Sequence, residues 1–401
     1  MRLSLPIAVC LIAASACSGA QVRDPQPDRR IIALDPIEFK ADRSGGKPEV
    51  FQRDRDLMYE AAMSALKAKQ WDQCQKGFDR VLAEFPADTA AHAFAFNAGL
   101  CAMRAGRHAQ AAERFAKSQV LAKGSRNARD ALFMRGEALE GGEKWADAAA
   151  VYKSALEDPA TMTDIGGKLG LLDELEAWAR MGICLRRANE HKDADLAFKR
   201  VEKLYEDNRE MPAVAESEWV ARSYYERSEI YYGLFVSIRF KLPVDRMQRE
   251  LEDKSNLFLK AETYYYRCVR MHLKPWSLAA GFRLGNLYQR FMDDIDNAEV
   301  PNDLDAYTLD VYRDELWNHT AHLAKRAIVF FDKNLELAER LGELDGEWAQ
   351  KSREGKKNME ETIARNNIRR LKLAKDEAAL LPQAPTPTVA PKLSPTKPKA
   401  R

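Results

Sequence analysis

The stretch from residue 136 to residue 155, GEALEGGEKWADAAAVYKSA, decides the fold. It places the small residue Gly136 nine positions before Trp145, and Ala148 and Tyr152 follow three and seven positions after that tryptophan. Small residues on two consecutive helices let the helices cross closely, and an aromatic residue on the second helix fills the wedge beside them. The stretch therefore predicts two short helices packed against each other.

The same pattern recurs along the chain at an interval of 37 residues. Its anchors are Trp71, His108 and Trp145. The small position before each anchor holds Ala62, Gly99 and Gly136, and the aromatic position after it holds Phe78, Phe115 and Tyr152. A fourth copy has Gly182, His191, Ala194, Phe198 and Val201. One helical pair cannot bury its apolar face alone, so the copies must stack.

This pattern, with Pro86 closing the first copy, resembles the tetratricopeptide repeat. The resemblance implies an all-α fold, a TPR-like α-solenoid of about six helical pairs with a C-terminal capping helix. We expect four repeats in residues 55–210, two elongated helical hairpins in 211–345 and a charged capping helix in 346–381. In the fifth pair the signature of the second helix, Ala261 to Cys268, arrives late. Longer helices or an insertion near residues 241–243 would account for this delay.

The first residues predict export. Residues 1–20 contain one charge, at Arg2, followed by an apolar run too short to span a bilayer, which is typical of a signal peptide. The small residues 14–16 before Cys17 resemble a lipobox, which implies cleavage before Cys17 and a lipid on it. Residues 18–20 offer an ordinary cleavage site instead. We expect an exported protein, either soluble in the periplasm or held at the outer membrane as a lipoprotein.

Two proline-containing segments flank the helical part. Residues 21–54 contain many helix breakers and predict a flexible N-terminal tether. Residues 382–401 are rich in proline, contain basic residues and have no acidic one, which predicts a disordered basic tail. The tail is either a solvated end or an arm that contacts an anionic cell-wall polymer.

Four cysteines remain after the signal peptide: Cys74, Cys101, Cys184 and Cys268. None stands in a CxxC pair or beside a histidine at ligand spacing, so we expect no zinc site. An exported protein can form disulfides, and a bridge between Cys74 and Cys101 is the one pairing to test. The alternative is that all four are unpaired, buried small residues.

The composition and the motifs give no sign of catalysis. The 63 basic and 61 acidic residues nearly cancel, so the chain has no global field for nucleic acid, and we expect no nucleic-acid partner. No phosphate loop of the usual kind is present, because Gly166 to Gly170 lacks the required ending and a preceding strand. His319 and His322 stand three apart without a convincing third ligand. We therefore expect no enzyme, no catalytic residue, no metal and no cofactor.

The resemblance also implies a binding surface. In the tetratricopeptide family the first helices line a groove, and their fifth residue points into it. We therefore expect a partner-binding groove formed by Tyr59, Met63, Phe96, Leu100, Met103, Phe133, Tyr225, Tyr232 and Phe282. The alternative is that these side chains only pack the framework.

These features favour a non-catalytic scaffold or adaptor of a bacterial envelope complex, which binds segments of envelope proteins in its groove. Similar exported repeat proteins accompany cell-wall synthesis, Tol-Pal coordination, outer-membrane assembly and gliding motility, and the sequence does not choose among them. One alternative is a groove that binds a glycan or another small ligand. A second alternative is an envelope enzyme with a site in residues 235–305.

Overall fold

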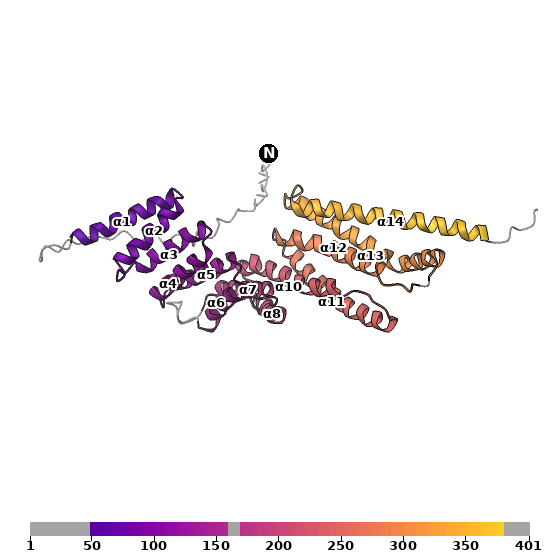
Figure 1. The fold of residues 1–401 in the computed structure, drawn as a ribbon, viewed down its shortest axis with the longest axis horizontal. Coiled ribbons are helices and arrows are strands. Elements are labelled where there is room, and N and C mark those ends of the chain that lie inside the picture. The colour runs from indigo at the N-terminus through magenta and orange to yellow at the C-terminus, as the bar shows by residue number, and fades with distance from the viewer. Residues whose placement is uncertain (1–48, 159–168, 303, 381–401) are drawn as a thin grey trace, which may run out of the picture. The chain divides into compact units, whose positions relative to one another are not determined.

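The structure is a computed structural model that describes residues 49–158, 169–302 and 304–380. Within these ranges all regular structure is helical (Figure 1). The predicted signal peptide with Cys17, most of the tether and the basic tail lie outside the described residues, as does most of the glycine-rich segment at 166–170. None of the described helices has the length and apolarity needed to cross a membrane.

The chain divides into two compact units, and the first ends at Leu169. Unit 1 consists of three antiparallel helical pairs, each of which packs against the next. Its helices are α1 (Glu49–Lys67), α2 (Trp71–Glu84), α3 (Ala91–Arg104), α4 (His108–Leu121), α5 (Arg126–Gly141) and α6 (Trp145–Glu157).

Unit 2 begins at Gly170 and contains three further pairs, followed by one long helix. Its pairs are α7 with α8, α10 with α11 and α12 with α13, and α14 packs on α13 and α12 (Figure 1). The bounds are α7 (Leu171–Arg187), α8 (His191–Asn208), α9 (Pro212–Ala215), α10 (Glu218–Ser237), α11 (Val244–Arg270), α12 (Trp276–Asp296), α13 (Ala306–Arg340) and α14 (Glu347–Leu380).

The predicted fold class is confirmed: the chain is all-helical within the described ranges and builds TPR-like solenoid stacks of six pairs with a terminal helix. The fifth pair is long because α11 itself has 27 residues. The sixth pair is long because α13, which begins at Ala306, has 35 residues. The division between the two units falls after the third pair. The predicted range of four repeats, 55–210, therefore extends from unit 1 into unit 2.

The small and aromatic positions pack as their pattern predicts. A Cβ atom added at Gly136 would lie 2.3 Å from the ring of Tyr152, and one added at Gly99 would lie 2.9 Å from Phe115. Tyr152 and Phe115 are fully buried. The absence of a side chain at these two glycines therefore lets the aromatic ring of the second helix pack against the first helix.

The turn inside each of the first four pairs uses the same backbone conformation. Lys69, Gly106 and Glu143, which are 37 residues apart, have φ values of 57°, 75° and 56°, and Asn189 in the fourth pair has 65°. This left-handed conformation ends a helix readily, because the following amides then bond back to the last carbonyls. The amide of Lys144 bonds in this way to the carbonyl of Leu139. The repeat is thus visible in the backbone as well as in the side chains.

The terminal helix α14 packs as if it began a seventh pair. The ring of Phe331 on α13 lies against Gly285 of its own pair, where an added Cβ would be 2.4 Å from the ring. The same ring lies against Gly355 of α14, where an added Cβ would be 2.5 Å away. One aromatic residue thus fills the wedge between a pair and the first helix of the next, and α14 covers the end of unit 2.

Candidate functional site

The helix α10 lies between α7 and α12 and packs on both of them. Its face toward the core of unit 2 carries Tyr224, Ser228 and Phe235, which are buried. The opposite face carries Arg222, Glu229 and Gly233, which recur at helical spacing and keep partial or full exposure. A Cβ atom added at Gly233 would meet nothing within 4 Å. This face of α10 is therefore open.

The edge of α10 that faces α7 combines an aromatic ring with ion pairs. The guanidinium of Arg180 on α7 lies 4.5 Å from the centroid of the Trp219 ring. Arg180 also donates to Glu176 at 2.9 Å. Two turns further along α10, the buried carboxylate of Glu226 lies 2.5 Å from a terminal nitrogen of Arg186. These contacts tie the fourth and fifth pairs together.

The edge of α10 that faces α12 is built from tyrosines. The ring of Tyr225 packs 5.6 Å from that of Trp276, and the hydroxyl of Tyr232 donates to Asn286 at 2.7 Å. The guanidinium of Arg283 pairs with Glu229 at 2.9 Å and lies 4.8 Å from the Tyr232 ring. We call the surface made by Arg180, Trp219, Arg222, Tyr225, Glu229, Tyr232, Trp276 and Arg283 the arginine–aromatic face.

The electrostatics of this face keep its tyrosines neutral. Burial, with the Glu229 carboxylate nearby, raises the pKa of Tyr225 to about 12. Burial likewise raises the pKa of Tyr232. A neutral phenol is a hydrogen-bond donor with an apolar ring, so both residues offer apolar area with a polar edge to a bound molecule. Such a surface suits binding more than proton transfer near neutral pH.

Three of the residues predicted to line a groove do not do so. Phe96, Leu100 and Phe133 keep 0%, 3% and 1% of their exposure, so this prediction is wrong for their side chains. The rings of Phe96 and Phe133 pack against Phe115 and Tyr152, which occupy the glycine wedges of the same pairs. In both pairs the aromatic ring of the second helix thus packs against the aromatic ring of the first helix, and both rings belong to the core.

The other predicted residues of unit 1 are partly buried. The Tyr59 ring packs 5.9 Å from Phe78 and 5.9 Å from Phe94. Met63 and Met103 pack against the apolar cluster of this unit. Their exposed remainder is small, and whether a partner uses it stays a prediction.

In unit 2 the structure brings together two predicted residues, Tyr225 and Tyr232, on the arginine–aromatic face. The third, Phe282, packs against Phe331 and Trp348, at 6.0 and 5.8 Å, between α12, α13 and α14. Sequence reasoning missed Arg222, Trp219 and Trp276. The only local signal was the spacing of three between Trp219 and Arg222, which puts both on one side of a helix.

Residues 235–305, where an enzymatic site was one alternative, contain a buried ion pair. The Lys254 ammonium donates to the carbonyls of Phe235 and Ile238, at 2.6 and 3.0 Å, and pairs with Asp294 at 2.8 Å. Burial lowers the pKa of Lys254. All three of its protons are engaged, so this lysine fastens the end of α10 to α11 and α12.

The histidines noted in the sequence are not drawn into a cluster. His319 lies 3.3 Å from Glu315 one turn earlier on α13, and both side chains are exposed. Among the described residues, no group of three or more histidine, cysteine, aspartate and glutamate side chains is placed to hold a metal ion.

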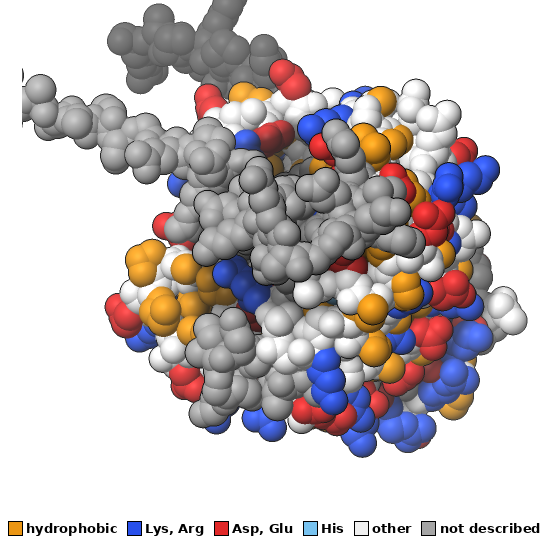
Figure 2. Space-filling model, turned by 90° about the vertical axis from the view of Figure 1, so that its left-hand side faces the viewer, with side chains coloured by type: hydrophobic (Ala, Val, Ile, Leu, Met, Phe, Trp, Pro, Cys, Tyr) orange, Lys and Arg blue, Asp and Glu red, His pale blue; other side chains and the backbone are white. Residues whose placement is uncertain are grey.

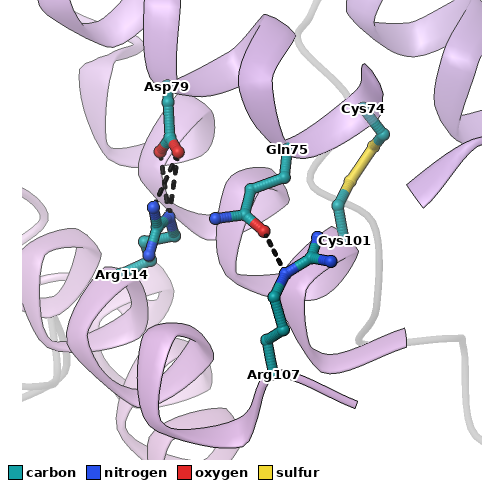
Figure 3. Close-up of a disulfide and its surroundings, with 6 residues drawn as sticks. All are labelled: Cys74, Gln75, Asp79, Cys101, Arg107 and Arg114. Carbon is teal, nitrogen blue, oxygen red and sulfur yellow. Dashed lines mark hydrogen bonds and ion pairs between the residues drawn. A yellow bond between two sulfur atoms is a disulfide. The ribbon is translucent and has the colours of Figure 1, made fainter. Parts of the chain in front are cut away.

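Cys74 and Cys101 form a disulfide, the one pairing that the sequence suggested. The bond joins α2 to α3 and so links the first pair to the second (Figure 3). Near it, Gln75 on α2 accepts from Arg107, the residue before α4, at 2.8 Å, and Asp79 on α2 pairs with Arg114 on α4 at 2.7 Å. Cys184 and Cys268 are buried.

The charged side chains of the described residues are intermingled on the surface seen in Figure 2. Lysines and arginines alternate there with aspartates and glutamates, and neither sign forms a continuous field on that view. Contacts that depend on charge would therefore be local on the surface that this view shows.

Comparison with known proteins supports the repeat pattern. The sequence model of the tetratricopeptide repeat family matches residues 56–88 and 130–159, which correspond to the first pair and to most of the third. No curated protein matches the sequence.

Several solved structures resemble parts of the fold at low identity. A tetratricopeptide repeat protein from Parabacteroides merdae is 15% identical, with 77% of this chain and 99% of that chain covered and a TM-score of 0.33. The apo form of RapI is 9% identical, with coverages of 72% and 99% and a TM-score of 0.39. The TPR domain of P58(IPK) is 12% identical, with coverages of 78% and 99% and a TM-score of 0.18.

Proposed function

We propose that this chain is an exported, non-catalytic scaffold of the bacterial cell envelope that holds a segment of a partner protein on the arginine–aromatic face. Proteins built from tetratricopeptide repeats generally act as scaffolds for protein interaction. The observation that carries the proposal is that the open face of α10 joins the first helices of three pairs and offers aromatic area and guanidinium groups at once. Aromatic residues and arginine are the side chains most enriched at binding hot spots.

Two features support export. The first twenty residues have the pattern of a signal peptide, and the Cys74–Cys101 disulfide is the kind of bond that persists in oxidising compartments. The proposal includes a lipid on Cys17 as the anchor to the outer membrane, and a basic tail that contacts the anionic cell-wall polymer. The identity of the partner would determine to which envelope complex the protein belongs.

Photo-cross-linking in living cells tests the binding role. A photoreactive phenylalanine analogue at Gly233 occupies open space on the arginine–aromatic face. The matched control carries the analogue at Arg200, an exposed position of α8 on the second-helix side. We expect a discrete cross-linked protein from position 233 and none of that mass from position 200. Equal products from both positions, or none from position 233, would contradict the proposal.

Cell fractionation tests the anchoring. Cys17→Ser should move the mature protein from the membrane fraction to the soluble periplasmic fraction, because the lipid would be lost. A wild-type protein whose mature N-terminus is an unmodified Gln21 would exclude the anchor while leaving export intact. A wild-type protein that remains in the cytoplasm with its first residues uncleaved would contradict the exported role.

A further inference from the structure

Arg222 occupies the centre of the arginine–aromatic face and is held there by two tryptophans. Its guanidinium carbon lies 5.6 Å from the centroid of the Trp219 ring and 5.0 Å from that of Trp276. The rings come from α10 itself and from α12, so they flank the group from two elements. A guanidinium attracted by two aromatic rings is restrained in position by both of them.

Arg222 lies farther from a carboxylate than the neighbouring arginines do. Its nearest carboxylate in the described part of the chain is Glu226, at 3.8 Å from Nε, and that residue already pairs with Arg186 at 2.5 Å. In contrast, Arg180 and Arg283 each have a carboxylate oxygen within 2.9 Å. The Nε atom of Arg222 is buried and has no hydrogen-bond partner among the described residues, although 26% of the side chain is exposed. Arg186 and Arg222 therefore share the carboxylate of Glu226.

The local charge selects the kind of group that completes the site. Arg186, Arg222 and Glu226 together carry one positive charge, which a single negative charge balances. A carboxylate supplies that charge and matches the planar fork of the guanidinium. Glu226 and Glu218, which accepts from the Trp276 indole at 3.1 Å, would repel a doubly charged phosphate more strongly than a singly charged carboxylate. The site thus fits a carboxylate.

The surface continues on both sides of Arg222. Toward α7 the series runs through Trp219 to Arg180, and toward α12 it runs through Trp276 to Tyr225. A chain that seats a carboxylate at Arg222 can therefore extend in both directions over aromatic rings. This arrangement suits an acidic residue inside a segment, with apolar neighbours that lie on the two indoles.

We propose that Arg222 anchors the partner by binding one internal aspartate or glutamate side chain of an extended segment, whose flanking apolar residues contact Trp219 and Trp276. This inference rests on the proposed function and specifies the partner chemistry for the same face.

Selection of peptides on the full-length protein tests the inference. The probe is a phage library of random twelve-residue inserts displayed between fixed glycine–serine flanks, so that no insert has a free C-terminus. We expect the selected inserts to share one acidic position with apolar neighbours. Synthetic versions with amidated ends, measured by fluorescence anisotropy, should bind Arg222→Gln at least about tenfold more weakly than the wild type.

Control variants separate charge, geometry and folding. Arg200→Gln on α8 makes the same change at an exposed second-helix position and should bind within about twofold of the wild type. Arg222→Lys keeps the charge but loses the planar fork, so it should also bind several-fold more weakly. Replacing the acidic peptide residue by its amide should weaken binding to the wild type but not further weaken binding to Arg222→Gln. Circular dichroism must show unchanged helix content in every variant.

The possible outcomes distinguish a failure of this inference from a failure of the proposed scaffold function. Selected peptides without a shared acidic position, or with equal affinity for Arg222→Gln, would overturn the inference and leave the scaffold role standing. The selected peptides are also synthesised with a free C-terminal carboxylate, and peptides that bind in that form but not with an amidated end would overturn the assignment to an internal side chain. A selection that yields no binding peptide would count against both proposals.

Discussion

At the scale of single residues, the glycines of the first helices decide whether a pair can close. The Gly136 position has no room for a methyl group, because Tyr152 is buried and its hydroxyl donates to Glu140 at 2.6 Å. Gly233, in contrast, faces open space near the C-terminal end of α10. The same substitution should therefore have opposite effects at these two helical positions.

We predict that Gly136→Ala destabilises unit 1 by about 1–3 kcal/mol, the usual cost of overpacking a core. Gly233→Ala should stabilise unit 2 by about 0.5–1 kcal/mol, because alanine loses less entropy in a helix. Urea unfolding followed by circular dichroism measures both. If Gly136→Ala unfolds at the same urea concentration as the wild type, the ring of Tyr152 is free to move, and the proposed close packing is absent.

One partly buried carboxylate, that of Asp293, predicts a pH dependence. Burial, with Asp296 nearby, raises the pKa of Asp293 to about 6. A carboxyl group whose pKa is higher in the folded state gives stability that is complete below its unfolded value, near 4, and lost as the pH rises through 6. Ionisation of Asp293 should therefore lower the free energy of unfolding of unit 2 at pH 7.

The variant Asp293→Asn removes that loss, so it should raise the free energy of unfolding at pH 7 by about 1 kcal/mol and by less at pH 4. Asp253→Asn, at an exposed position of α11, serves as the control and should change little at either pH. Denaturant melts at the two pH values measure the difference. An Asp293→Asn effect of equal size at both would show that ionisation of this group is not its cause.

At the scale of helices, the disulfide should contribute more to unit 1 than any of the ion pairs around it. It closes a loop with a sequence separation of 27, which corresponds to roughly 3.5 kcal/mol in the chain-entropy description. The pair Asp79–Arg114 is partly exposed and contributes at most about 1 kcal/mol. Covalent linkage of the first two pairs is thus the dominant local restraint.

We predict that reduction with dithiothreitol lowers the urea midpoint of the unit 1 transition in the wild-type protein. The double variant Cys74→Ala/Cys101→Ala should start from the lower midpoint and show no response to reductant. Cys268→Ala, which removes a buried unpaired thiol of unit 2, should leave the response of unit 1 unchanged. A double variant that still responds to reductant would place the redox effect elsewhere.

The helices also show what the sequence could and could not predict. The six pairs followed from small and aromatic residues a few positions apart, because a helix brings such neighbours together whatever the rest of the chain does. The burial of Phe96 and Phe133 was missed, since it depends on where a ring from the other helix comes to lie. The stacking of Arg222 between Trp219 and Trp276 was missed because a contact between α10 and α12 leaves no periodic trace.

At the scale of the molecule, each unit has an apolar core of its own. The cluster around Phe96 draws only on unit 1, and the cluster around Phe235 draws only on unit 2. Cores that do not share residues allow each part of a chain to fold by itself. We predict that residues 170–401 expressed alone form a helical protein with a cooperative thermal transition, measured by circular dichroism.

A matched fragment that starts at Glu218 provides the control. It lacks α8, so the buried Arg227 loses Asp195 and Glu202, which lie 2.7 and 2.6 Å away. A buried charge without its partners destabilises strongly, and this fragment should melt at a lower temperature and less cooperatively. If the fragment 170–401 melts without cooperativity, unit 2 depends on unit 1.

The bond between Cys74 and Cys101 also makes a closed covalent ring of the chain between them. The turn from α2 to α3 lies inside this ring, and Pro86, Ala87 and Thr89 in it are exposed. Exposed turns are where proteases cut most readily. A single cut there opens the ring but releases nothing, because both new ends stay attached through the sulfur atoms. A nicked molecule would stay one covalently linked molecule until it met a reductant, so a protease cannot separate the N-terminal segment from the following repeats by cutting at this turn alone.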